Sequence, residues 1–273
     1  MTKLYVSVDI EGVAGVVHWD QVMPGAPAYP EGRRLLVEEL NALCRGALAA
    51  GVETIVVNDA HSSMRNIVPD ELPARVRTVT GHFKPMYMME GLDESFDAAV
   101  FLAYHGPAGS ASVLSHTYNP RVIWEARLDG EVTGETGINA MVARHYGVPV
   151  ILVTGDDVTI ADAKRWIPEA TGVTVKRSIG RFAADSMTPE ASRAEISAAI
   201  QTSLRSTPAK EPSNERRHRL QLTLQSAEMA TIAEWVGATR IGDRVITIEG
   251  HSGLEVYRRF HTTLLTARTV AET

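Results

Sequence analysis

The stretch Ser7-Val8-Asp9-Ile10-Glu11-Gly12 lies close to the amino terminus and overlaps the end of the first apolar run, residues 4–9. Successive side chains of a β-strand point to opposite faces, so Ser7, Asp9 and Glu11 are expected to share one face. Two carboxylates at the end of a buried strand repel each other unless a positive charge lies between them. A divalent cation would supply that charge. The alternative to a cation site is that the two acids of an isolated Asp-x-Glu pattern are simply solvated at a polar strand end.

The rest of the chain alternates between strand and helix patterns. Apolar, β-branched runs predict strands, and leucine and alanine at helical spacing predict a helix directly after the first strand, which favours parallel pairing with a right-handed crossover. The predicted strands are residues 53–61, 75–79, 98–105 and 148–157, and the predicted helices are residues 31–50 and 134–147. Asp129-Gly130 is typical of a hairpin turn. The pattern predicts a doubly wound α/β fold with a mostly parallel sheet.

The organisation changes near residues 206–219, where prolines and a run of charged residues predict an exposed connector. Beyond it the patterns predict strands over 220–224 and 244–249 and helices over 227–235 and 253–265. We therefore expect an α/β domain over residues 1–206 and a smaller C-terminal α+β subdomain over residues 207–273.

Composition and charge argue against several classes of protein. The 27 Lys and Arg residues against 33 Asp and Glu residues give a net charge of −6, whereas nucleic-acid binders usually carry a basic face. No stretch approaches the roughly 20 apolar residues that span a bilayer, and the first residues lack a signal-peptide pattern. The single cysteine, Cys44, cannot form an intrachain disulfide, which fits a reducing cytoplasm. We expect a cytoplasmic protein with small-molecule or peptide partners.

Polar residues end several of the predicted strands. The carboxyl ends of parallel strands meet at one edge of a sheet, and here they carry Asp9 and Glu11, Asp59 and His61, His105, and Asp156 and Asp157, with Glu135 at a helix start. Each residue alone has a structural alternative as a cap or a satisfied core group. Together, buried polar groups at several strand ends would destabilise the fold unless a bound ion or another partner compensated them. Carboxylates and imidazoles suit Zn²⁺, Mn²⁺ or Fe²⁺, and a two-metal hydrolytic site becomes a hypothesis.

His116 lies a short loop after His105, in a serine-rich stretch that must return over the same sheet edge. A histidine beside such a centre can move protons or stabilise an oxyanion. The alternative is a loop histidine in solvent.

These residues resemble a known family, the zinc-dependent D-aminopeptidases associated with bacterial dipeptide-permease operons. The matching stretches run in family order through the first 160 residues, whereas the C-terminal third is similar only in length and pattern. They are residues 7–12, Val57-Asn58-Asp59-Ala60-His61-Ser62, Lys84-Pro85, residues 89–93, Tyr104-His105, Ser115-His116, residues 134–140 and Gly155-Asp156-Asp157.

The resemblance implies a role for each candidate residue. Asp9 would bridge two zinc ions, Glu11 and His105 would complete one site, and His61 and Glu135 would complete the other. His116 would be the catalytic histidine. The family also implies a decamer of two stacked pentameric rings around a channel, with residues 207–273 serving assembly or lining the channel. Gly106-Pro107-Ala108 departs from the larger side chain expected after His105, which affects the substrate pocket.

The leading hypothesis is a dinuclear zinc aminopeptidase that removes an N-terminal residue, a D-amino acid such as D-alanine or glycine, from short peptides or amides. One alternative is a two-metal hydrolase of another amide or of a phosphoester, because such sites support several hydrolyses. The other is a metal- or peptide-binding protein without turnover.

Overall fold

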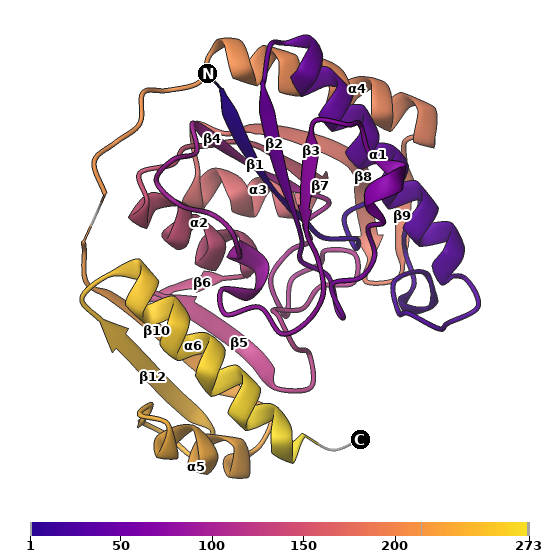
Figure 1. Ribbon diagram of the computed structural model, residues 1–273. Coiled ribbons are helices and arrows are strands. Elements are labelled where there is room, and N and C mark those ends of the chain that lie inside the picture. Colours follow the sequence, from indigo (N-terminus) through magenta and orange to yellow (C-terminus); the bar gives the residue numbers. More distant parts are fainter. Residues whose placement is uncertain (1, 214, 272–273) are drawn as a thin grey trace.

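Two β-sheets form the framework of the chain, and helices cover both faces of the larger sheet (Figure 1). The structure, a computed structural model, describes residues 2–213 and 215–271. The larger sheet has the strand order β3-β2-β1-β4-β7-β8-β9. Its strands are β1 (Lys3–Val8), β2 (Thr54–Asp59), β3 (Val76–Val79), β4 (Ala98–Leu102), β7 (Val150–Asp156), β8 (Thr171–Gly180) and β9 (Ala183–Ser186). All neighbours pair in parallel except β8 and β9, which confirms the mostly parallel sheet.

The central strand β1 is buried on both faces, which explains its continuous apolar run. Leu4, Val6 and Val8 pack in a core with helices α1 (Tyr29–Ala49) and α4 (Pro189–Arg205), which lie against each other on one face (Figure 1). Tyr5 points to the opposite core. The side chain of Ser7 lies on the same face of β1 as Tyr5, and its Oγ donates a hydrogen bond to the carbonyl of Met88 at 2.8 Å. The face that carries Tyr5 and Ser7 therefore leads to Asp9.

The opposite face is covered by α2 (Glu135–His145) and α3 (Asp157–Trp166). Their buried residues belong to the same core as the smaller sheet and its helix α6 (Gly253–Ala267), which contacts α2. The hydrophobic driving force is roughly proportional to the apolar area removed from water. The core that the two sheets share therefore holds them together.

The smaller sheet is antiparallel and has the order β11-β12-β10-β5-β6. Its elements are β5 (Ile123–Leu128), β6 (Glu131–Thr133), β10 (His218–Leu224), α5 (Ala227–Trp235), β11 (Thr239–Arg240) and β12 (Val245–Gly250). The predicted hairpin is confirmed, with Asp129 and Gly130 at φ 52° and 94° between β5 and β6. Because β5 pairs with β10, this sheet draws strands from both sides of the division expected at residue 206. That division stays a prediction.

The expected elements that the structure contains differ from their predicted bounds mainly at their ends. The strand expected over 98–105 ends at Leu102, because Ala103 adopts a φ of 60° and turns the chain. Residues 157–205, for which the sequence patterns gave no assignment, supply α3, β8, β9 and α4. Short 3-10 helices complete the fold at Trp19–Gln21, Pro69–Glu71, Tyr87–Met89 and Arg268–Val270. Within the described ranges, no helix combines the length and apolarity needed to cross a bilayer.

Candidate metal centre

The structure brings all six predicted site residues together at the carboxyl edge of the larger sheet. Asp9 and Glu11 follow β1, His61 follows β2, His105 follows β4, Glu135 begins α2, and His116 lies in the loop between β4 and β5. All six are buried, from 1% exposed for Glu11 to 8% for His116. Their roles stay predictions, whereas their proximity is a property of the fold.

Asp9 occupies the middle of the cluster. Its Oδ1 lies 3.1 Å from Nδ1 of His61, and its Oδ2 lies 3.5 Å from Nε2 of His105. Oε2 of Glu11 lies 3.1 Å from the same nitrogen of His61. Ligand atoms of Asp9, Glu11 and His105 fall within 4.8 Å of one another. The two oxygens of Asp9 thus face two different histidines.

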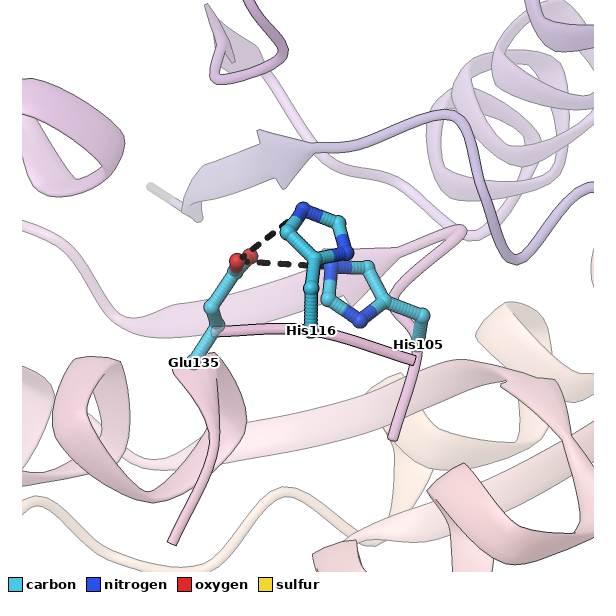
Figure 2. Close-up of side chains that lie close together, drawn as sticks. All are labelled: His105, His116 and Glu135. Carbon is cyan, nitrogen blue, oxygen red and sulfur yellow. Dashed lines mark ion pairs between the residues drawn. The ribbon is translucent and has the colours of Figure 1, made fainter. Parts of the chain in front are cut away.

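Glu135 closes the other side of the cluster, as Figure 2 shows. Its Oε1 lies 3.3 Å from Nε2 of His105 and 3.9 Å from Nε2 of His116, and it accepts a hydrogen bond from the backbone N–H of Tyr118 at 2.6 Å. The imidazoles of His105 and His116 stack with centroids 4.0 Å apart and planes 11° apart. Glu135, His105 and His116 also form a group of ligand atoms within 4.8 Å.

Backbone carbonyls orient the three imidazoles. Nε2 of His61 lies 2.8 Å from the carbonyl of Val22, Nδ1 of His105 lies 3.0 Å from that of Gly106, and Nδ1 of His116 lies 2.8 Å from that of Leu114. A carbonyl only accepts, so each of these nitrogens carries a proton and donates. The opposite nitrogen of each ring faces the cluster, where it can bind a metal or a second proton. Metal-binding histidines commonly have this outer hydrogen bond.

Burial and mutual repulsion set the charges of the carboxylates. Burial raises the pKa of Asp9 well above its usual range, and the charge of Glu11 raises it further. Burial also raises the pKa of Glu11 and Glu135, but the neighbouring His61 and His105, respectively, outweigh it and lower both pKa values. Glu11 and Glu135 therefore favour the ionised form, whereas Asp9 between them favours the protonated form.

The histidines respond to that negative charge. Burial lowers the pKa of His61 and His105, yet the carboxylates around them outweigh burial, raising the pKa of His61 well above its usual range and that of His105 to about 10. Burial and the adjacent His105 lower the pKa of His116 to about 4. His116 is thus neutral near pH 7, with an unprotonated Nε2 at the edge of the cluster.

Two buried atoms of the cluster lack hydrogen-bond partners among the described residues, Oε2 of Glu11 and Nε2 of His105. Unsatisfied buried polar atoms are costly, and here both belong to groups that bind cations. Three carboxylates and inward-facing imidazole nitrogens form a donor set that zinc prefers. The residues present therefore fit a resident divalent metal.

The backbone beside the ligands is tightly packed. A Cβ on Gly12 would lie 2.1 Å from the carbonyl oxygen of Tyr104, so only glycine fits directly after Glu11. A Cβ on Gly106 would lie 2.5 Å from Cβ of Ser112, which accounts for a small residue after His105. The glycine at position 106, where a larger side chain is expected from the family, is thus required by the packing of this loop.

A buried lysine supports the segment after β1, and sequence reasoning missed it. Nζ of Lys176, on β8, donates to the carbonyls of Glu11, Val13 and Val16 at 2.5, 2.9 and 2.6 Å. Its side chain is 2% exposed. Nothing in the local sequence around Lys176 signals this role, because its partners lie about 160 residues away in the chain.

The other acids at strand ends serve the backbone instead of the cluster. Asp59 accepts hydrogen bonds from the backbone N–H groups of Asn66 and Ile67 at 2.6 and 3.0 Å. Asp156 caps α3 through the N–H of Thr159 at 2.8 Å and accepts from the N–H of Val113 at 2.7 Å. These carboxylates fix the turns that carry His61 and His116.

Comparisons with known proteins point in the same direction. A family model described as D-aminopeptidase matches residues 2–262. The chain is 38% identical over 190 residues to a D-aminopeptidase of Bacillus subtilis (strain 168), an alignment that covers 68% of each chain. The chain also resembles the structure of a Zn-dependent D-aminopeptidase from Bacillus subtilis, which is described as a self-compartmentalizing protease. The TM-score is 0.93, and the sequences are 30% identical over 100% of both chains.

Proposed function

Because the chain belongs to the D-aminopeptidase family, a family of metallopeptidases, we propose that it is a dinuclear zinc enzyme that removes the N-terminal residue from short peptides or amides. The residue removed would be a D-amino acid such as D-alanine, or glycine. The observation that carries the proposal is the position of Asp9, whose two oxygens face His61 and His105 separately. A bridging carboxylate in a two-metal site has this arrangement.

The proposed ligands are the five residues expected from the sequence. Asp9 would be shared, Glu11 and His105 would complete one zinc site, and His61 and Glu135 would complete the other. The mutual proximity of ligand atoms of Asp9, Glu11 and His105 supports the first set. The contacts also offer another division of the same five ligands, because Oε2 of Glu11 lies 3.1 Å from Nδ1 of His61 and Oε1 of Glu135 lies 3.3 Å from Nε2 of His105.

The chemistry divides between the metal and the chain. Bound zinc would polarise the scissile carbonyl and lower the pKa of a water molecule. His116 would accept a proton at Nε2, which is unprotonated near neutral pH, and pass it to the leaving amine. The free amino group of the substrate, in its neutral form, would be a further ligand of one zinc ion, which would favour cleavage after the first residue.

The proposal is tested by metal content and by hydrolysis of D-alanine, L-alanine and glycine p-nitroanilides, with p-nitrophenyl phosphate as a phosphoester control. We expect about two zinc ions per chain, anilide hydrolysis without phosphoester hydrolysis, and loss of both metal and activity in Asp9→Ala. The variants His61→Ala and His105→Ala are each expected to retain less than the full metal content. Metal-free protein, or bound metal with no turnover of any anilide, would overturn the proposal.

We also propose the decamer of two pentameric rings and a cytoplasmic location. The support for assembly is the related structure, which is described as a self-compartmentalizing protease. The support for the location is the single, buried Cys44. Light scattering on the purified protein tests the decamer, with a mass near ten times 29.7 kDa as the expected result.

A further inference from the structure

The hairpin formed by β8 and β9 brings a cation to the edge of the candidate metal centre. Its tip consists of Arg181 and Phe182, between Gly180 and Ala183. The backbone carbonyl of Arg181 accepts a hydrogen bond from the N–H of Leu114 at 2.8 Å. Nη2 of the Arg181 side chain donates to the carbonyl of Ser115 at 3.2 Å. Both bonds attach the tip to the loop between β4 and β5, next to His116.

Aromatic rings hold the guanidinium group in place. The guanidinium carbon of Arg181 lies 5.7 Å from the ring centre of Trp19 and 5.7 Å from that of Phe182. Trp19 in turn meets the imidazole of His116 edge to face, with centroids 5.4 Å apart. Trp19 therefore contacts both the guanidinium of Arg181 and the imidazole of His116. Stacking on aromatic faces restricts a guanidinium without occupying its hydrogen-bond donors.

Within residues 2–213 and 215–271, no carboxylate forms an ion pair with Arg181, and the side chain of Arg181 reaches the surface. Phe182 beside it is 50% exposed. A positioned cation with free donors, next to a reaction centre, is a recognition group for an anion.

The centre and its rim suit the two ends of a short peptide. Under the proposed function the amino end of the substrate lies at the metal centre, whereas the guanidinium of Arg181 attracts a carboxylate. A short peptide carries a free carboxylate at its other end. An extended chain advances about 3.3–3.6 Å per residue, so a di- or tripeptide has the length to cover the contacts of 5.7 Å and 5.4 Å that link Arg181, Trp19 and His116.

We infer that Arg181 binds the free carboxylate of a di- or tripeptide whose amino end lies at the metal centre. This inference rests on the proposed function and specifies its substrate class. Arg181 acts as a specificity-determining residue, because it selects short peptides with a free carboxyl terminus over amides and longer chains.

The test compares D-alanyl-D-alanine with its C-terminal amide, which differ only in the charge that Arg181 would recognise. The variants are Arg181→Gln, Arg181→Lys and the control Arg177→Gln, which removes another exposed arginine of the same hairpin. We expect Arg181→Gln to lower kcat/KM for the free acid about 10- to 100-fold, mainly through KM, and to change the amide less than about threefold. Arg181→Lys should retain part of the preference, and Arg177→Gln all of it.

The ratio of acid to amide separates the possible outcomes. Equal losses on both substrates would mean that Arg181 only supports the His116 loop, and would overturn the inference. If Arg181→Gln hydrolysed both the acid and the amide as fast as the parent protein does, the inference would be overturned as well. If the parent protein with full zinc content hydrolyses neither peptide nor any anilide, the proposed function itself fails and the subsite fails with it.

Discussion

Glu39 provides a direct link between pH and the stability of the fold. It lies on α1 and is 2% exposed. Its Oε1 accepts hydrogen bonds from Oγ of Ser192 at 2.6 Å and from the N–H of Ala14 at 3.1 Å, whereas Oε2 has no partner among the described residues. Burial raises its pKa from 4.5 to about 7, against the opposing effect of these hydrogen bonds.

The sign of the effect follows from proton binding. Between pH 4.5 and about 7 the folded state holds a proton on Glu39 that the unfolded state has lost, so stability falls as pH rises through this window. The difference between the two pKa values corresponds to about 3 kcal/mol of destabilisation once both states are ionised. Glu39→Gln keeps the accepting oxygen and removes this dependence. Its unpaired amide costs about 1–3 kcal/mol at every pH.

The assay is the melting temperature of the parent protein and of Glu39→Gln at pH 5, 6, 7 and 8, at constant zinc concentration. Relative to the parent, the variant should gain about 5–10 °C between pH 5 and pH 8. Glu38→Gln is the matched control, because it removes a half-exposed, surface-paired carboxylate from the same helix. A temperature difference between Glu39→Gln and the parent that stays constant with pH would refute the reasoning.

Three further outcomes follow from the site. His116→Ala should lower kcat by roughly 10²–10⁴-fold while zinc content stays unchanged, and loss of zinc in this variant would show that His116 is a ligand. Lys176→Met should destabilise the fold by about 2–5 kcal/mol, because three carbonyls lose their donor, and wild-type melting and zinc retention would contradict its supporting role. Chelation of zinc should lower the melting temperature by roughly 5–15 °C, because Asp9, Glu11 and Glu135 lose their counter-charge; an unchanged melting temperature in calorimetry would argue against a resident metal.

The sequence predicted the strands of the sheet centre and the residues at their ends, because both signals are local. An apolar run identifies a buried parallel strand, and side-chain alternation places Asp9 on the face of Tyr5 and Ser7. Alternation also explains why Asp59 differs from Asp9. It shares a face with Ile55 and Val57, which belong to the core under α1, and it therefore fixes a turn.

Long-range pairing could not be predicted in the same way. The pairing of β5 with β10 joins segments about 90 residues apart, and neither strand signals its partner. The exposed and buried positions of β8 do not form a clean pattern, so the strand that carries Lys176 and leads to Arg181 gave no local signal. The residues that support and surround the site depend on this distant chain, whereas the candidate ligands do not.

The hairpin of β5 and β6 interrupts the chain between His116 and Glu135. After His116 the chain leaves the larger sheet, forms two strands of the smaller sheet, and then returns to begin α2 with Glu135. A fragment that ends at residue 206 would keep every candidate ligand but lose β10, and Ala126 and Leu128 of β5 would lose one of the two strands beside them. We therefore expect gene truncation or domain grafting at residue 206 to weaken the span between two site residues, because that span pairs with a strand from beyond the cut.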